Sequence, residues 1–255
     1  MSPKSFLFEF QASAGGKFYP VPHVDEAQMR EVDRIAVEDF GLGILQMMEN
    51  AGRNLAAVAL SMLGEDRSAP VVVAAGSGGN GGGGLCAARH LHNRGVPVTV
   101  VLSRRCEELG GAAAVQMEIL NKAGVQARPA EDLPGILPDA ALVLDALIGY
   151  SLRGAPAGVT RGAIEEINAS GRPVVSLDLP SGLDASSGET PGTCIRAGKT
   201  LTLALPKSGL TNPLAGELIL ADIGIPPELY DQIGVKFNPF WGSGWRLPIR
   251  RIEHI

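Results

Sequence analysis

An apolar run, Val71–Ala75, leads directly into a segment in which seven of the nine residues from Gly76 to Gly84 are glycine. Residues 85–94 then have the pattern of a helix. This order brings backbone amides close to a phosphate, because no Cβ intervenes and a helix N-terminus carries partial positive charge. The same glycines would also suit a flexible surface loop. Asn80, whose side chain both donates and accepts hydrogen bonds, favours a binding site.

Short apolar runs alternate with helical segments through the middle of the chain. Because consecutive positions in these runs are apolar, we expect strands buried on both faces, as in a parallel sheet covered by helices on each side. The predicted fold class is α/β, a three-layer αβα sandwich with a Rossmann-like, doubly wound, mostly parallel sheet. The expected strands are residues 71–75, 98–102, 142–145, 174–178 and 201–205, and the expected helices are 85–94, 112–123 and 160–170.

The two ends of the chain have less regular patterns. Two helices are expected before the sheet, over residues 25–41, with the first residue as N-cap, and over residues 43–63. Residues 1–22 are expected to form an irregular arm, and residues 237–255 form either a docking tail or a strand and loop that close the domain. Without a linker-like segment, residues 1–255 are predicted to form a single domain. The arm and the second helix would suit the interface of a homodimer.

The composition excludes several classes of function. The formal net charge is −5 and aromatic residues make up 5% of the chain, so neither a nucleic acid nor a membrane is expected as a partner. The N-terminal apolar patch is too short for a secretory signal or a membrane span. Three widely spaced cysteines fit neither a disulfide framework nor a zinc motif, which indicates a reducing compartment. A cytoplasmic location is therefore expected.

Polar residues follow several of the predicted strands, at the ends where ligands of doubly wound sheets bind. Asp145 and Asp178 each end a strand, Ser181 follows the second of these acids, and Lys207 follows the last predicted strand. A buried carboxylate needs a partner, so Asp145 either caps the next loop through backbone N–H groups or belongs to a functional site. A second acid at the adjacent strand end favours the site.

Three of these strand-end residues share one type of ligand atom. Asn80, Asp145 and Ser181 offer hard oxygen donors without sulfur or imidazole, which selects against zinc and copper. With only one carboxylate, the set suits a monovalent cation better than a divalent one.

A dinucleotide fingerprint of the GxGxxG kind can be read within residues 76–81, although this run can be aligned to it in several ways. No acid closes the second predicted strand, where a ribose-binding carboxylate belongs; Ser103-Arg104-Arg105 stands there instead. This ending suits a phosphate better than a ribose hydroxyl, but a solvated pair of charges is the more common role of such residues at the end of a strand.

Five segments carry motifs in a fixed order: Met47-Met-Glu-Asn-Ala-Gly-Arg53, Asn80-Gly-Gly with Ala87-Ala-Arg-His-Leu91, Leu144-Asp-Ala-Leu-Ile-Gly149, Leu177-Asp-Leu-Pro-Ser-Gly-Leu-Asp184 and Pro206-Lys-Ser-Gly-Leu210. Together with Ala221-Asp-Ile-Gly-Ile-Pro226, they resemble the YjeF N-terminal domain family over about residues 24–230. Each motif alone is modest, but the ordered set is highly specific.

The resemblance implies repair of damaged nicotinamide cofactor by an NAD(P)H-hydrate epimerase, an isomerase. Water added across the C5–C6 double bond of NADH or NADPH gives R and S hydrates, NADHX and NADPHX, which such an enzyme interconverts. A separate dehydratase then restores the cofactor from the S form. The resemblance also implies one potassium ion (K+) per subunit, held by Asn80, Asp145 and Ser181.

The resemblance further implies which residues contact the substrate and suggests a mechanism. We expect Asp178 to act as general acid and base at the hydrated ring, with Lys207 as its electrostatic partner. Arg153 is expected to face a phosphate. The implied substrate contacts are Gly79, Asn80, Gly81, Gly82, Gly83, Gly149, Tyr150, Ser151, Leu152, Arg153, Gly154, Ala155 and Asp178.

Four positions depart from the family pattern. Gly79 and Gly83 stand where the family loop has Asn and Asp, Ser151 where Gly is common, and Gly198 where Asp is usual. These departures leave open a catalytically impaired nucleotide-binding or protein-interaction module of the YjeF type, as in domains recruited to RNA-decapping scaffolds. A third interpretation, an ordinary dehydrogenase, is less favoured because the second strand lacks its acid.

Overall fold

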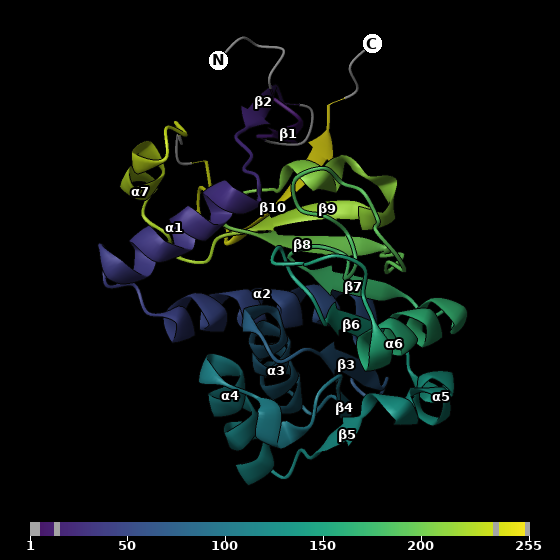
Figure 1. Cartoon of the computed structure of the whole chain (residues 1–255). Helices are drawn as coiled ribbons and strands as arrows, with labels where there is room; N and C mark the ends of the chain where they lie inside the picture. Colours follow the sequence, from purple (N-terminus) through teal and green to yellow (C-terminus); the bar gives the residue numbers. More distant parts are fainter. Residues whose placement is uncertain (1–5, 13–15, 237–239, 253–255) are drawn as a thin grey trace.

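The computed structural model describes residues 6–12, 16–236 and 240–252. In this part of the chain, ten strands form one sheet in the order β2-β1-β10-β9-β8-β7-β6-β3-β4-β5 (Figure 1). The strands are β1 Phe8–Gln11, β2 Phe18–Val21, β3 Val71–Ala75, β4 Val98–Leu102, β5 Ala127–Pro129, β6 Leu142–Ala146, β7 Val174–Leu177, β8 Lys199–Leu203, β9 Glu217–Ala221 and β10 Arg246–Arg251.

Seven α-helices accompany this sheet in the described residues, and they cover both of its faces. Helices α2, α3 and α4 pack on one face, and α5 and α6 pack on the other, so the predicted three-layer α/β sandwich is confirmed (Figure 1). The helices are α1 Glu26–Glu38, α2 Ile44–Leu63, α3 Gly79–His92, α4 Gly111–Lys122, α5 Leu133–Ile136, α6 Gly158–Ala169 and α7 Pro227–Gln232. In the described ranges, no helix has the length and apolar character that a bilayer crossing requires.

The order of the strands shows where a ligand is expected to bind. Strands β5, β4, β3, β6, β7, β8 and β9 are parallel neighbours. From β3 the chain proceeds to β4 and β5 in one direction, and from β6 it proceeds to β7, β8 and β9 in the other. The switch point therefore lies between β3 and β6, and their carboxyl ends form the expected ligand crevice.

The ends of the chain are more regular than the sequence predicts. Strands β1 and β2 lie within the predicted irregular arm, which is therefore wrong for these residues. Strand β1 pairs antiparallel with β10, and β10 with β9, so the C-terminal segment contains a strand that closes the sheet, as one of its two predicted alternatives has it. The partners of β1 in β10 lie more than 200 residues away, so a local pattern does not reveal this pairing. The rest of both predicted end segments, residues 1–5, 13–15, 237–239 and 253–255, lies outside the described residues.

The glycine-rich segment is mainly helical, which corrects the prediction of a long turn. Helix α3 begins at Gly79, six residues before its expected start. A side chain at Gly82 would meet Met48 of α2, and a Cβ at Gly83 would come 2.7 Å from the Leu177 side chain. A Cβ at Gly84 would come 2.5 Å from that of Ala146 on β6. These glycines let α3 pack closely against α2 and the sheet, rather than exposing amides to a ligand.

Candidate active site

A cavity of about 810 Å³ lies at the carboxyl ends of the central strands, at the predicted switch point. We call it the main cavity. Its walls come from α1, the first half of α2, and the segments that follow β3, β4, β6, β7 and β8. The crevice expected from strand order is thus confirmed, and α1 and α2 add a wall to it that the strand pattern does not predict.

The first turn of α3 forms one side of the main cavity. Ser77, Gly78 and Gly79 are exposed there, and the first hydrogen bond of the helix runs from the Gly82 N–H to the Gly78 carbonyl. The N–H groups before Gly82 have no carbonyl of this helix to bond, so they are available to an anion. The structure therefore retains the predicted phosphate-binding geometry over a shorter segment.

Asp145 is fully buried at the end of β6, where it organises the adjacent loops. Its carboxylate accepts hydrogen bonds from the Ser176 hydroxyl at 2.7 Å, from both the hydroxyl and N–H of Ser181 at 2.5 and 2.9 Å, and from the Leu147 N–H at 3.3 Å. All of these donors are neutral. Burial raises the pKa of Asp145, while the hydrogen bonds from Ser181 oppose this effect. Asp145 is thus a loop cap, as one alternative predicted, and an uncompensated buried acid.

Asn80 and Ser181 lie on either side of the loop that follows β6. The Ser181 hydroxyl accepts the Ile148 N–H at 2.8 Å, and the Asn80 side chain lies against the next residue, with its Oδ1 3.3 Å from where a Gly149 Cβ would stand. The Asn80 Nδ2 is buried, and no described group bonds it. Asn80, Asp145 and Ser181 therefore converge on one loop, with an orphaned polar atom beside them.

Asp178 and Lys207 form a buried ion pair that opens into the main cavity. Their side chains are 5% and 1% exposed, and the Lys207 Nζ donates to Asp178 Oδ1 at 2.5 Å and to the Leu203 carbonyl at 2.8 Å. Asp178 has φ +67°, a left-handed conformation that costs free energy in a residue other than glycine. The adjacent strand ends thus hold the Asp178–Lys207 ion pair at the cavity wall.

Asp33 on α1 is a site residue that sequence reasoning missed. It lines the main cavity and accepts a 2.5 Å hydrogen bond from the Tyr150 hydroxyl. Burial raises the pKa of Asp33, while this hydrogen bond and the positive charge of Lys207 lower it. Helix α1 has the charged, amphipathic pattern of a surface helix, in which Asp33 is one polar residue among several. No local signal distinguishes it.

The other predicted substrate contacts differ in their placement. Gly79, Asn80, Gly83, Gly149, Tyr150 and Ser151 line the main cavity, as does Asp178. Gly81 and Gly82 are buried within α3, and Leu152 is also buried. Arg153, Gly154 and Ala155 are exposed and do not line the main cavity. Their substrate contacts stay predictions.

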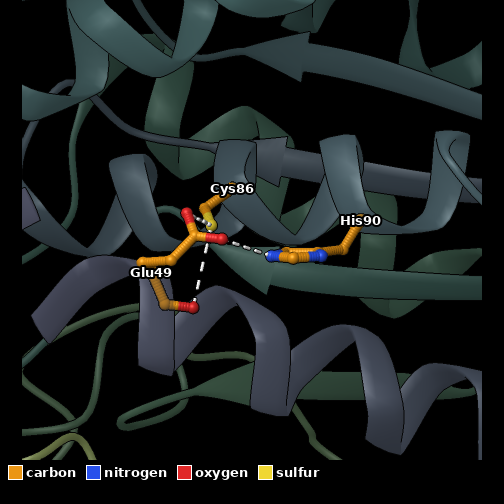
Figure 2. Close-up of side chains that lie close together, drawn as sticks. All are labelled: Glu49, Cys86 and His90. Carbon is orange, nitrogen blue, oxygen red and sulfur yellow. Dashed lines mark hydrogen bonds and ion pairs between the residues drawn. The ribbon is translucent and has the colours of Figure 1, made fainter. Parts of the chain in front are cut away.

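A second cluster of titratable side chains joins α2 to α3 outside the main cavity. Glu49, Cys86 and His90 point toward one another in Figure 2, and the Glu49 carboxylate lies 2.7 Å from His90 Nε2 and 3.3 Å from Cys86 Sγ. The Arg89 guanidinium contacts both Glu49 and Cys86, so a metal ion here would have to displace a cation already in place. Burial raises the pKa of Cys86 to about 12, which keeps its thiol protonated. We assign this cluster to the attachment of the two helices.

Comparison with known proteins places these motifs in a family. The family described as YjeF-related protein N-terminus matches residues 44–209. A protein named NAD(P)H-hydrate epimerase from Dehalogenimonas lykanthroporepellens is 51% identical over 209 residues, covering 82% of this chain and 84% of the relative. A protein of the same name from Rhodopirellula baltica is 34% identical over 221 residues, covering 84% and 89%.

Longer relatives and one solved structure show the same similarity. A Moorella thermoacetica protein named bifunctional NAD(P)H-hydrate repair enzyme Nnr is 38% identical over 219 residues, covering 81% of this chain but only 41% of the relative. The crystal structure of the yeast protein ynu0 matches 89% of this chain and 100% of its own, with a TM-score of 0.80 at 23% identity. At this identity the match supports the fold alone.

Proposed function

Because the chain belongs to the YjeF-related protein N-terminus family, we propose that it is an NAD(P)H-hydrate epimerase that interconverts the R and S epimers of NADHX and NADPHX. The observation that carries this proposal is the Asp178–Lys207 ion pair at the wall of the main cavity. A buried ion pair contributes little net stability, so its position beside a cavity and a helix N-terminus favours a chemical role.

In the proposed reaction, the hydroxyl group on one carbon of the hydrated ring leaves as water and a new water adds to the same carbon. The site must therefore first give a proton to the departing oxygen and then take one from the new oxygen. At C6, a proton passes from the Lys207 ammonium through the Asp178 carboxylate to the departing hydroxyl, so that the C6–O bond breaks and water leaves a cationic ring. Water then adds to the opposite face and forms a new C6–O bond. The Asp178 carboxylate takes the proton of this water and passes it back to Lys207, which returns the pair to its starting state. Lys207 holds the carboxylate in place through its hydrogen bond. Overall, one proton is given and one is regained.

The first turn of α3 would hold the phosphates of the substrate while the ring reaches Asp178. Its N–H groups and the helix dipole favour an anion, and Gly79 exposes this turn to the main cavity. Two arginines of α1, Arg30 and Arg34, also line the cavity, where each pairs with acids of the same segment, so the helix N-terminus is the main source of attraction for an anion.

We expect Asp33→Asn to reduce kcat roughly tenfold without lowering stability at neutral pH. The pKa of Asp33 depends on the hydrogen bond from Tyr150 and on the charges of Lys207, Asp178 and Arg30. The charge of Asp33 in turn raises the pKa of Tyr230.

The folded pKa of Asp33 is raised, so its contribution to stability is present below the unfolded pKa and is lost as pH rises through the folded pKa. Asparagine at position 33 cannot ionise, so the Asp33→Asn variant should gain stability relative to the original chain as pH increases. Thermal melts at several pH values and a kcat measurement test this, and a lower melting temperature at pH 7 would contradict it.

We propose that this site binds potassium. Asp145 is a buried carboxylate with neutral hydrogen-bond donors, so a bound monovalent cation would compensate its charge. The buried Asn80 Nδ2 has no described partner. If the side-chain amide is turned by 180°, its oxygen takes the place of Nδ2 and can act as a ligand. Asn80, Asp145 and Ser181 would hold the ion, whose charge would stabilise the loop that follows β6.

Potassium should raise the melting temperature of the chain by a few degrees over lithium at equal ionic strength, because an ion that binds only the folded state stabilises it. Asn80→Ala should abolish the difference, since it removes one predicted ligand atom from a side chain whose Nδ2 bonds no described group. Differential scanning fluorimetry provides the measurement. Equal melting temperatures in both salts would exclude a potassium site here.

A nucleotide-binding or protein-interaction module without catalysis is the alternative. Gly79 and Gly83 favour it, because they lack the polar side chains that the family pattern has at these two positions. The buried charges of Asp145, Asp178 and Lys207 argue for the enzyme, since a module of this kind gains nothing from their desolvation.

A coupled assay separates the two functions. When an S-specific dehydratase acts on a mixture of both hydrates, adding the chain should make the whole mixture reactive, whereas a module would leave the R fraction unconverted.

We also propose a cytoplasmic homodimer that works alongside a separate dehydratase. The cysteines Cys86, Cys106 and Cys194 are free, which suits a reducing compartment. The exposed aromatic side chains Phe18 and Tyr19 on β2 offer a surface for a second copy. Sedimentation equilibrium tests the dimer. The names of the bifunctional relatives support the link to a dehydratase.

A further inference from the structure

A second cavity of about 700 Å³ lies over the carboxyl ends of β4 and β5. It adjoins the main cavity, because Ser103, Arg104 and Thr160 line both. The two cavities therefore lie side by side along the carboxyl ends of the strands, the main cavity at the switch point and the second beside it. The main cavity contains the proposed reacting groups, and nothing in the proposed reaction uses the second.

The lining of the second cavity is locally basic. It includes three arginines, Arg104, Arg105 and Arg128, and two glutamates, Glu108 and Glu131, although the whole chain has a net charge of −5. Such a local excess of positive charge attracts an anion. The remaining walls include apolar groups, which can cover the face of a base.

Arg104 is the arginine most available to a ligand. Arg105 donates to the Glu108 carboxylate at 2.8 Å, and Arg128 pairs with Asp132 at 2.6 Å. Arg104 lies 4.0 Å from the same Glu108, so its guanidinium shares a carboxylate that Arg105 already binds more closely. It also stands at the junction of the two cavities.

The topology indicates which part of a dinucleotide would reach this place. In doubly wound sheets the pyrophosphate sits at the N-terminus of the helix after the first central strand, here α3 after β3. The ribose of the adenosine half then lies at the end of the next strand, here β4. That strand ends in Ser103-Arg104-Arg105, without the acid that would bind a free 2′-hydroxyl, and an arginine there accommodates a 2′-phosphate.

We propose that the second cavity binds the adenosine half of the hydrated dinucleotide and that Arg104, assisted by Arg105, binds a 2′-phosphate, so that the chain prefers NADPHX over NADHX. This inference rests on the proposed function for the orientation of the substrate, with its nicotinamide ring at Asp178. A phosphomonoester dianion matches the donor geometry of a guanidinium, which forms two parallel hydrogen bonds with it.

The experiment measures binding of adenosine 2′,5′-bisphosphate and of adenosine 5′-monophosphate by isothermal titration calorimetry. The original chain should bind the bisphosphate roughly tenfold more tightly, and Arg104→Gln should remove most of this difference. Arg161→Gln is the matched control, because Arg161 is as exposed as Arg104, pairs with Glu165 at 2.8 Å and lines neither cavity. It should keep the full preference.

Equal affinity for the two nucleotides, or a preference that survives Arg104→Gln, would overturn the inference. The kcat/KM ratio of NADPHX to NADHX should fall by a similar factor in Arg104→Gln. Nucleotide binding does not depend on turnover, so a lost 2′-phosphate preference beside intact epimerisation rejects the subsite alone. Absent epimerisation beside a clear preference rejects the proposed function alone.

Discussion

Asp178→Asn should lower the rate of hydrate epimerisation by roughly 10²- to 10⁴-fold, the range expected for loss of a general acid and base. Asparagine is the appropriate replacement because it tolerates the left-handed backbone conformation that Asp178 adopts at φ +67°. It keeps the shape of the side chain but removes its charge and its basicity. The measurement is kcat with a single isolated epimer as substrate.

The same substitution leaves the Lys207 ammonium buried without its carboxylate, which costs about 3–5 kcal/mol of stability. A second variant therefore separates folding from chemistry. Asp178→Asn combined with Lys207→Met removes both charges, so it should recover most of the lost stability but none of the activity. Activity near the original level in a folded form of either variant would show that Asp178 is not the acid and base.

Gly81→Ala should destabilise the chain by about 3 kcal/mol, because a Cβ at this position overlaps the carbonyl oxygen of Gly76. The backbone turn that leads from β3 into α3 would have to move, and with it the first turn of the helix. For a chain of this size the melting temperature should fall by roughly 6–12 °C. Urea unfolding followed by circular dichroism gives the free energy directly.

Gly79→Ala is the matched control in the same turn of α3. A Cβ there meets nothing within 4 Å, and alanine is the better helix former, so stability should stay the same or rise by about 1 kcal/mol at most. If all glycines of this segment served only to expose amides, the two substitutions would affect stability equally. A Gly81→Ala variant as stable as Gly79→Ala would therefore contradict the packing account.

The central sheet could be predicted from sequence because its strands are short, apolar and buried on both faces. Strands β3 and β4 have the predicted bounds, and β6 extends one residue further. The strands that were missed are of a different kind. Strand β5 contains an arginine and a proline, β9 is only partly buried, and β1 pairs antiparallel with β10, whose paired residues lie more than 240 residues later in the chain. Pairing of this type is set by tertiary contacts, which a local pattern does not contain.

The site could be predicted where its residues follow strands, and not where a helix contributes them. Asp145, Asp178 and Lys207 stand after apolar runs, and the carboxyl ends of parallel strands meet at one edge of a sheet. Asp33 belongs to α1, which reaches the cavity only through the packing of the whole fold. The sequence pattern predicts a phosphate-binding turn for the whole glycine-rich segment, whereas helix contacts account for Gly82 and Gly83.

The most direct test of the proposed function starts from one purified epimer. The (R)-hydrate of NADPH is incubated with the chain in potassium buffer, and the two epimers are separated by liquid chromatography at intervals. We predict rapid approach to the same R and S mixture that spontaneous epimerisation reaches slowly, with Asp178→Asn giving only the spontaneous rate. Conversion no faster than in buffer alone, with a folded chain and potassium present, would contradict the account.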